Sequence, residues 1–323
     1  MKRRALLILP VAAALGIAAY IWLRSQPPVA DRAYIRSRSV TVWNRVAQVR
    51  EPVATLRYGD MVELLERRGE NVRIRTSQGA TGWVSERSLM LPELWEKATQ
   101  LVEQARALPV QARGRTKVLS NLRTEPGRDA PRILQISSDV PVEVVARSVA
   151  EWKTSGEEEP SRGTAPPAKK DSGPRREDWV LVRAREEEVG EAAGWVLARF
   201  IEPDLPPPLR DLGANIRWMA WFELDRVPVE DGEKPQFLGA GVTGPEGQPC
   251  DFTLLRVYTW NPKRHRYETA YIESNFCGRL PVRVAPVAGE VAFRFASQGK
   301  TGEEQREYRF RQNIVRRLRA GGR

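Results

Sequence analysis

The sequence predicts a mainly β protein with an apolar N-terminal helix, two small repeated β units joined by an amphipathic helix, and a C-terminal antiparallel β domain. Three observations predict this class. The chain contains 24 prolines and 24 glycines, which suits short strands and turns. Short runs of alternating apolar residues recur, and the tripeptide Gly-Trp-Val closes two similar series of them. A length of 323 residues leaves room for two or three domains at about 100–200 residues each.

The counts of ionisable and sulfur-containing residues exclude several kinds of site. The 52 basic and 41 acidic side chains give a net charge of +11, and the chain has one histidine and two cysteines. A multi-histidine metal site, a four-cysteine zinc site and a site of two cysteines and two histidines are therefore excluded. The glycines of 239–244 are followed by Pro245 rather than by a helix, so they do not form a dinucleotide fingerprint. We expect no metal and no cofactor.

Residues 1–24 predict a membrane anchor or signal segment. Three basic residues precede an uncharged apolar run that extends from Ala5 to Leu23. At about 1.5 Å per residue this run gives roughly 28 Å, close to the ~30 Å hydrocarbon core of a bilayer. The basic residues favour a cytoplasmic N-terminus. We therefore expect a single-pass inner-membrane protein, N-terminus cytoplasmic, with the bulk of the chain periplasmic or extracellular. A cleaved signal peptide and a buried soluble helix remain alternatives.

A proline-containing linker (25–34) leads into the first β unit, which we place at 35–91. Its strand-like runs include an alternating segment at 71–75, and Gly82-Trp83-Val84 closes it. An amphipathic helix is predicted over the spacer 92–109, with apolar residues at three- and four-residue spacing between Pro92 and Pro109. This helix either fixes the orientation of the two units or docks a partner.

The second β unit is predicted at 110–204 and repeats the order of features of the first. Its run at 142–145 matches 62–65, and Gly194-Trp195-Val196 matches the earlier closing tripeptide. The second unit carries about 32 extra residues, which we place in one loop. The stretch 151–178 has six basic and seven acidic residues and few apolar ones, so we interpret it as a disordered insertion. A partner-binding loop is the alternative.

The second unit also carries Asn121-Leu122-Arg123 before a Pro-Gly loop and Asp178-Trp179-Val180 in a later strand. With the closing tripeptide, this order resembles the bacterial SH3 family, in two tandem copies. The first copy departs from the family pattern at Asn71, where Trp is common. The resemblance implies two small barrels of five to six strands. It also implies binding of cell-wall peptides or other proteins, without catalysis of their own.

Five aromatic residues are candidates for ligand contact in these units. The tryptophans of the two closing tripeptides either pack a barrel core or form an exposed platform, and the other three are candidates for a groove. The candidates are Trp43, Tyr58, Trp83, Trp179 and Trp195.

The remaining chain is predicted to be a stiff, extended Pro-rich linker (205–211) and a separate antiparallel β domain with a basic tail (212–323). Asn261-Pro262 predicts a hairpin turn between two strand-like runs. No family resemblance is found for this domain. Its two cysteines, Cys250 and Cys277, predict a disulfide in an oxidising compartment, with two buried free thiols as the alternative.

The end of the chain, from Arg306 to Arg323, contains seven arginines and one glutamate, a pattern that attracts polyanions. The predicted export makes nucleic acid a poor partner, so an anionic envelope surface is the expected one; a solvated strand face is the alternative. The candidate contacts are Arg309, Arg311, Arg316, Arg317 and Arg319.

Catalysis would have to use Cys277 and His265. Ser274–Leu280 slightly resembles an L,D-transpeptidase signature, but Phe276 replaces the glycine before the nucleophile. We therefore expect no catalytic residue and no enzymatic activity. The expected function is a membrane-anchored, extracytoplasmic binding protein that uses tandem bacterial SH3 domains to bind the cell wall or an envelope protein. The alternatives are an architectural envelope assembly protein and a cysteine-dependent wall-modifying enzyme. The sequence does not set the oligomeric state.

Overall fold

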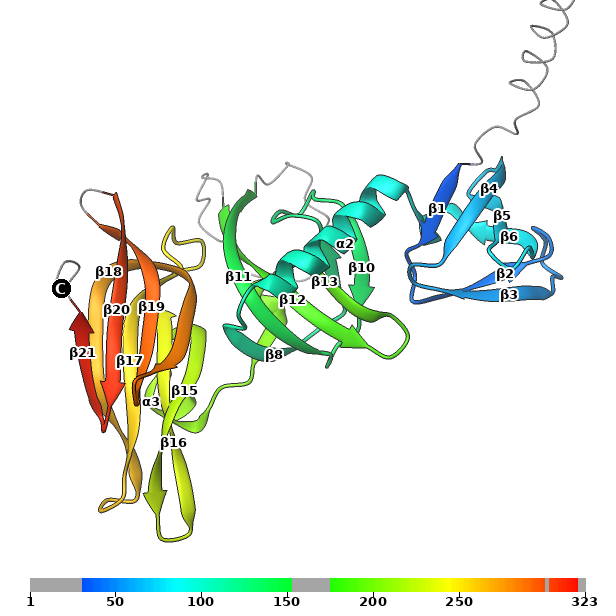
Figure 1. Ribbon diagram of the computed structural model, residues 1–323. Helices are drawn as coiled ribbons and strands as arrows, with labels where there is room; N and C mark the ends of the chain where they lie inside the picture. Colours follow the sequence, from blue (N-terminus) through cyan, green and yellow to red (C-terminus); the bar gives the residue numbers. More distant parts are fainter. Residues whose placement is uncertain (1–30, 153–174, 300–301, 319–323) are drawn as a thin grey trace, which may run out of the picture. The chain divides into compact units, whose positions relative to one another are not determined.

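The computed structural model describes residues 31–152, 175–299 and 302–318. These residues form three antiparallel sheets of seven strands each (Figure 1), so the prediction of a mainly β protein is confirmed. The chain divides into two compact units, one ending at Pro92 and the other beginning at Glu93. The second and third sheets therefore share one unit, whereas the sequence suggested a separate C-terminal domain.

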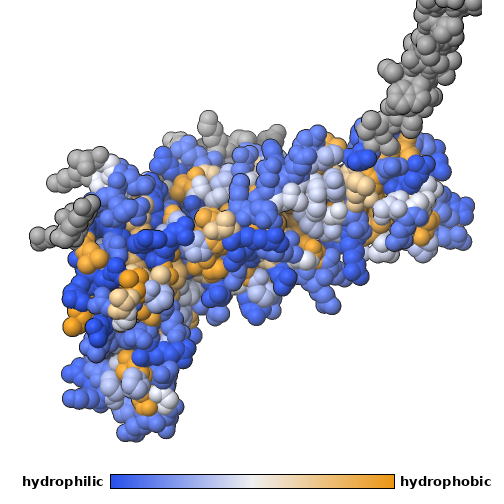
Figure 2. Space-filling model, in the orientation of Figure 1, coloured by the Kyte–Doolittle hydropathy of each residue, from blue (hydrophilic) through white to orange (hydrophobic). Residues whose placement is uncertain are grey.

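The surface of these sheets is polar over most of the face that Figure 2 shows, and its hydrophobic residues lie in small separate patches. Large apolar side chains that are exposed include Val49, in a loop of the first unit, and Ile272 and Ile314 of the third sheet. Single exposed apolar residues are normal for a folded protein. Candidate contact surfaces are therefore better sought among the aromatic and charged side chains.

The first sheet has the strand order β3-β2-β6-β5-β4-β1-β7. Its strands are β1 (Arg32–Ile35), β2 (Ser39–Trp43), β3 (Pro52–Arg57), β4 (Met61–Arg68), β5 (Asn71–Thr76), β6 (Thr81–Ser85) and β7 (Leu89–Met90). One face packs a core of small and β-branched residues that includes Val42, Val72 and Ile74. The linker predicted to run to residue 34 is too long, because β1 already begins at Arg32 and pairs with β4.

The second sheet has the strand order β10-β9-β13-β12-β11-β8-β14. Its strands are β8 (Ala112–Thr116), β9 (Ser120–Arg123), β10 (Arg132–Ile136), β11 (Pro141–Trp152), β12 (Arg175–Glu186), β13 (Gly190–Leu197) and β14 (Ile201–Pro203). When the strands are numbered from the start of each sheet, the two orders are the same. Both sheets also have a short 3-10 turn before their last strand, at Glu86–Ser88 and Ala198–Phe200.

The two sheets share their irregularities as well as their order. A β-bulge interrupts β4 between Leu64 and Glu66, and another interrupts β11 between Val144 and Ala146, at the equivalent place. The register also shifts at equivalent places in β3 and β10. Bulges are placed features of a strand rather than defects, so the repeat extends to the backbone path.

The extra residues of the second sheet fall in two connections rather than one. Leu64 pairs with Ile74 in the first sheet, whereas the equivalent Val144 pairs with Val182, so most of the extra chain joins the fourth strand to the fifth. Ile74 pairs with Gly82, eight residues later, whereas the equivalent Val182 pairs with Gly194, twelve residues later. The connection from the fifth strand to the sixth is therefore four residues longer in the second sheet.

The predicted disordered insertion is too wide at both ends. Glu151 pairs with Arg176, and Trp152 with Arg175, so 151–152 and 175–178 belong to β11 and β12. These paired positions continue a ladder that is long enough to satisfy the backbone groups of both segments. The rest of the predicted insertion, 153–174, lies outside the described residues.

The helix predicted between the units is present as α2 (Pro92–Ala107). Its buried residues are Ala98, Leu101 and Ala105, at three- and four-residue spacing, as expected for one apolar face. The end of α2 is attached to the second sheet, because Arg106 forms an ion pair with Glu191 of β13 at 2.6 Å.

The third sheet is a meander with the order β15-β16-β17-β18-β19-β20-β21. Its strands are β15 (Arg217–Val229), β16 (Gly232–Val242), β17 (Phe252–Asn261), β18 (Arg266–Val287), β19 (Glu290–Gly299), β20 (Gly302–Arg311) and β21 (Ile314–Leu318). The predicted hairpin after Asn261 joins β17 to β18. The first half of β18 pairs with β17 and its second half with β19. The meander therefore folds into two layers, and β18 runs from one layer into the other (Figure 1).

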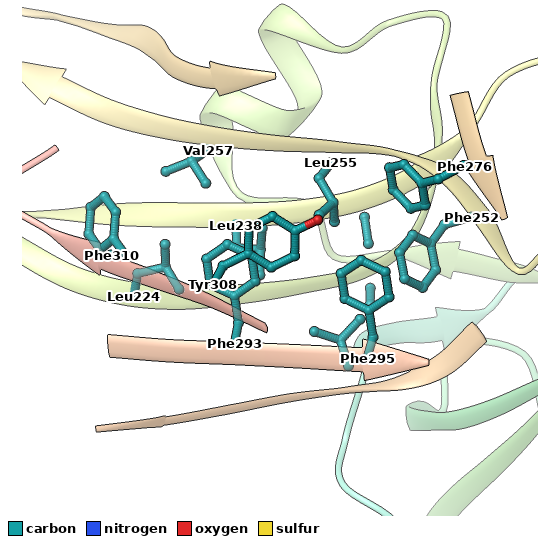
Figure 3. Packing of buried hydrophobic residues seen from close by; sticks show 13 residues of the cluster. Leu224, Leu238, Phe252, Leu255, Val257, Phe276, Phe293, Phe295, Tyr308 and Phe310 are labelled. Atoms are coloured by element: carbon teal, nitrogen blue, oxygen red, sulfur yellow. The ribbon is translucent and has the colours of Figure 1, made fainter. Parts of the chain in front are cut away.

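An aromatic core fills the space between these layers. Phe293 and Phe295 of β19 and Tyr308 of β20 point toward Leu238 and Leu255 of the other layer (Figure 3). The rings of Phe293 and Tyr308 are stacked with centroids 4.8 Å apart. This core is continuous from β15 to β20, so the third sheet is one folded body.

The predicted extended linker at 205–211 is wrong over its second half, which forms the short helix α3 (Pro207–Leu212). Proline is compatible with the first turn of a helix, and Leu209 anchors α3 by burial against Trp218 and Tyr258. Trp218 lies over two glycines of β16. A side chain at Gly239 or Gly241 would approach the Trp218 ring to 2.6 or 3.0 Å, so these glycines make room for the indole.

The predicted N-terminal anchor and most of the linker before β1 lie outside the described residues. Across 31–152, 175–299 and 302–318, no helix has the length and apolar character needed to cross a membrane.

Candidate functional site

The outer face of the first sheet, opposite its core, carries two of the candidate aromatic residues. Val72 and Ile74 of β5 point into the core, so Arg73 between them points outward. Trp83 pairs with Arg73, and Trp43 pairs with Trp83. Residues that pair across strands share a face. Both tryptophans therefore lie on this outer face.

Arginine side chains cover both indoles. The guanidinium carbon of Arg50 lies 4.2 Å from the ring centre of Trp43, and that of Arg68 lies 5.2 Å from that of Trp83. Trp83 is 8% exposed under this cover. Such cation–π contacts contribute about 0.5–1 kcal/mol each at exposed sites, so the arginines can move aside for a ligand. We call Trp43, Trp83 and the nearby Arg50, Arg68 and Arg73 the aromatic–arginine face.

The glycine before each closing tryptophan has a steric reason. A Cβ atom at Gly82 would lie 2.7 Å from the backbone oxygen of Trp43, and one at Gly194 would lie 2.7 Å from the Cβ of Leu122. Strands β6 and β13 therefore cross β2 and β9 at a distance that only glycine permits. The tripeptide places the tryptophan on the outer face while its valine packs in the core.

The corresponding face of the second sheet differs because α2 lies on it. Leu181 of β12 pairs with Trp195 and is 3% exposed, whereas the equivalent residue in the first sheet is the exposed Arg73. Arg183, two residues along the same face, donates a hydrogen bond to the carbonyl of Ala105 in α2 at 3.4 Å. Trp179 is also buried in β12. The structure therefore brings Trp43 and Trp83 together. It leaves Trp179 buried and Trp195 half-buried on the face of the second sheet that carries α2.

Tyr58 is not part of the aromatic–arginine face. It follows β3 at the turn into β4, two residues after the core residue Leu56, and is half-buried. Burial raises the pKa of Tyr58 to about 12.

Most of the arginines predicted to contact an anionic surface make ion pairs within the third sheet. Arg309 pairs with Glu307, Arg316 with Glu290, and Arg317 with Glu273. Arg311 is exposed, and Arg319 lies outside the described residues.

Glu273 also accepts hydrogen bonds from the hydroxyls of Tyr271 and Tyr308, at 2.6 and 2.9 Å. Desolvation, followed by the hydrogen bond to Glu273, raises the pKa of both phenols. This cluster is internally paired and links β18 to β20.

The predicted disulfide is present and joins Cys250 to Cys277, whose Cα atoms are 5.0 Å apart. Both cysteine sulfur atoms are thus bonded to each other. His265 is an exposed turn residue with a φ of 47°.

A buried ion cluster beside the disulfide was not predicted from the sequence. Arg147 of β11 has a side chain that is 1% exposed, and it contacts Asp178 at 2.5 Å and Asp251 at 3.0 Å. It also donates hydrogen bonds to the carbonyls of Gln248 and Cys250. This arginine clamp joins the second sheet to the loop before β17. Its members come from widely separated parts of the chain and no spacing links them, so only the folded chain reveals it.

Comparison with known proteins does not assign the chain to a family. No protein-family model and no curated protein matches the sequence. The chain is similar to the solved structures of NlpC2 and NlpC1 from Trichomonas vaginalis, at 10% identity with TM-scores of 0.18 and 0.19 over 55% of this chain and 49% and 47% of those chains. It is also similar to an NlpC/P60 family protein from Bacillus cereus, at 13% identity and a TM-score of 0.22 over 53% of this chain and 55% of that one. The chain thus spans about half the length of the structures that it matches.

These matches contradict the expectation that the chain has no enzymatic activity, because NlpC/P60 family proteins are cysteine peptidases. We therefore no longer hold that expectation. At TM-scores of 0.18–0.22, the matches do not transfer an activity or a catalytic residue to this chain.

Proposed function

We propose that this chain is an extracytoplasmic, membrane-anchored binding protein of the cell envelope, in which tandem bacterial SH3 units bind cell-wall peptides or envelope proteins. The observation that carries the proposal is the aromatic–arginine face of the first sheet. The same fold in the second sheet has its equivalent face under a helix, whereas the described residues of the first unit supply no such helix. The first face is thus left with side chains suited to a ligand.

The chemistry of this face favours an anionic, partly flat ligand. Guanidinium groups bind carboxylates in a bidentate manner, and indole rings stack on flat or apolar groups. Within 31–92 the chain has eleven arginines and seven acidic residues, so the local charge also favours an anion. Cell-wall peptides, which carry free carboxylates, are ligands of this kind.

Two further features support the proposal. The repeated strand order agrees with two copies of one small β module, as the resemblance to bacterial SH3 domains implies. The disulfide agrees with an oxidising, extracytoplasmic compartment. The proposed location, a single-pass anchor in the inner membrane with the sheets outside the cytoplasm, follows from the N-terminal sequence.

A sedimentation assay with purified cell-wall sacculi tests the proposal. The test variant replaces three arginines of the aromatic–arginine face, and the control variant removes the same charge elsewhere on the first unit. The test substitutions are Arg50→Ala, Arg68→Ala and Arg73→Ala; the control substitutions are Arg32→Ala, Arg57→Ala and Arg87→Ala.

We expect the test variant to bind about tenfold more weakly, the effect of losing roughly 1.4 kcal/mol, and the control to bind like the wild type. Absence of wild-type binding both to sacculi and to envelope proteins in a pull-down would overturn the proposal. Equal losses in both variants would show that net charge, and not this face, is responsible.

A further inference from the structure

The third sheet carries a groove between two open strand edges, distant in sequence from the aromatic–arginine face. β15 is an edge strand whose only strand partner among the described residues is β16. Among the described residues, the part of β18 from Arg279 onward pairs only with β19, so its other edge is also open. A cavity of about 710 Å³ lies between these edges, with Trp221–Leu224 on one wall and Val284–Pro286 on the other. Ligand pockets typically occupy roughly 300–1,000 Å³.

One segment of the chain already occupies the start of this groove. The backbone N–H of Trp221 in β15 donates to the carbonyl of Gln111 at 2.9 Å. On the opposite wall, the side-chain amide of Gln111 accepts from the N–H of Val282 at 2.8 Å and donates to its carbonyl at 3.2 Å. Gln111 thus bridges the two edges in the way that an inserted strand would, with its backbone on one and its amide on the other.

The backbone groups beyond Gln111 continue the same pattern. Trp221 directs its N–H to the open edge of β15, so alternation places the backbone groups of Glu223 on that edge too. Likewise the N–H groups of Leu280 and Val282 point toward the open edge of β18, where they donate to the side chains of Asp251 and Gln111. By the same alternation, the N–H group of Val284 faces this open edge. Each wall therefore presents a further residue whose hydrogen-bonding groups face the groove.

The side chains around the groove define the occupant further. Leu224 and Phe237 are buried at its base, and Val291 is half-buried beside them. At its rim, Asp204 is exposed and makes no ion pair with a described residue, whereas the basic Arg113 of the same lining is paired with Glu143 at 3.5 Å. A strand with alternating apolar and basic residues would place its apolar side chains at the base of the groove and its basic side chains at the rim.

We propose that this groove binds an extended polypeptide segment of a partner protein, with alternating apolar and basic residues, by adding a strand to the open edges of β15 and β18. Strand addition draws its affinity from main-chain hydrogen bonds and its specificity from side-chain pockets. Gln111 supplies the internal example of this mode. The proposal does not depend on the aromatic–arginine face or on cell-wall binding.

Binding of a synthetic peptide to the full chain tests this inference. The probe is a fluorescein-labelled peptide of alternating valine and lysine, and its control is the same sequence with every second backbone nitrogen methylated. Two variants block the groove. Glu223→Pro removes an N–H from the open edge without removing a bond to β16, and Ala285→Trp fills the space. Val287→Trp, on the same strand but outside the groove, is the matched control.

Fluorescence anisotropy should show saturable binding of the unmethylated peptide, reduced about tenfold by methylation, which removes the peptide's donors. We expect a similar loss for Glu223→Pro and Ala285→Trp, and no change for Val287→Trp. Hydrogen exchange should slow at the amides of Glu223 and Val284 when the peptide binds. If Ala285→Trp fails to fold, Glu223→Pro and the exchange data decide. Absence of saturable binding, equal binding of the methylated peptide, or unchanged exchange at both amides would overturn the inference.

Discussion

Replacing Arg147 by methionine should destabilise the second compact unit strongly. Its guanidinium neutralises Asp178 and Asp251, whose side chains are 2% and 10% exposed. The substitution keeps much of the apolar volume but leaves two carboxylates without their buried partner. Removing one member of a buried ion pair costs about 3–5 kcal/mol. The N–H of Gly247 still donates to Asp178, so we expect a value toward the lower end of this range.

The repeat provides a matched control for this measurement. Arg67 of β4 pairs with Val72 as Arg147 pairs with Val180, so the two arginines hold equivalent places in their sheets. Arg67 is 60% exposed and contacts Glu86 at 3.3 Å. Exposed pairs contribute about 0–1 kcal/mol, so Arg67→Met should change the free energy of unfolding by less than about 1 kcal/mol.

Urea denaturation followed by tryptophan fluorescence measures both effects, with far-ultraviolet circular dichroism to check that each variant folds. A combined variant with Asp178→Leu and Asp251→Leu should recover part of the loss, because no buried charge remains. The reasoning would be refuted if Arg147→Met cost no more than Arg67→Met, or if the combined variant were less stable than Arg147→Met alone.

Three further outcomes follow from the described contacts. Gly82→Ala should lower stability by about 1–3 kcal/mol, since its Cβ would lie 2.7 Å from the backbone oxygen of Trp43; an unchanged melting temperature would contradict this. Cys250→Ser should cost roughly 3.5 kcal/mol on the chain-entropy model for a separation of 27 residues, and dithiothreitol should destabilise the wild type but not this variant. Glu177→Gln should destabilise the protein at neutral pH, because hydrogen bonds from Arg128, and then from Arg199, lower the pKa of this carboxyl. The ionised form stabilises the fold above the unfolded-state pKa of about 4.3, and this contribution is lost as the pH falls through the lower folded-state pKa; the difference between wild-type and variant melting temperatures should therefore shrink in acid.

Local sequence patterns predicted the strands, helix and turn that are determined by residues close together in the chain. The alternating run at 71–75 is a strand, the spaced apolar residues after Pro92 form a helix, and Asn261-Pro262 begins a hairpin turn. Pairing of Cys250 with Cys277 also followed from their being the only two cysteines. In each case the prediction depends on a few neighbouring residues or, for the disulfide, on there being only two cysteines in the sequence.

Features that depend on distant contacts were missed or misjudged. The prolines at 206–208 suggested an extended linker, but burial of Leu209 against Trp218 favours a helix. The sequence allows Trp83 to be either a core residue or an exposed platform, whereas in the structure it lies opposite the core under Arg68. The arginine clamp and the groove join segments that no local pattern connects.

The unequal connections of the repeated sheets have a practical consequence for engineering. The second sheet carries a much longer connection between its fourth and fifth strands than the first does, yet the strands on either side keep the same register. The second sheet thus shows that this fold accepts a long insertion between its fourth and fifth strands. In the first sheet, the equivalent turn at Gly69 has open space around it and is a suitable place for an epitope tag or a small reporter domain, which would allow the protein to be localised in cells with both of its ends left native.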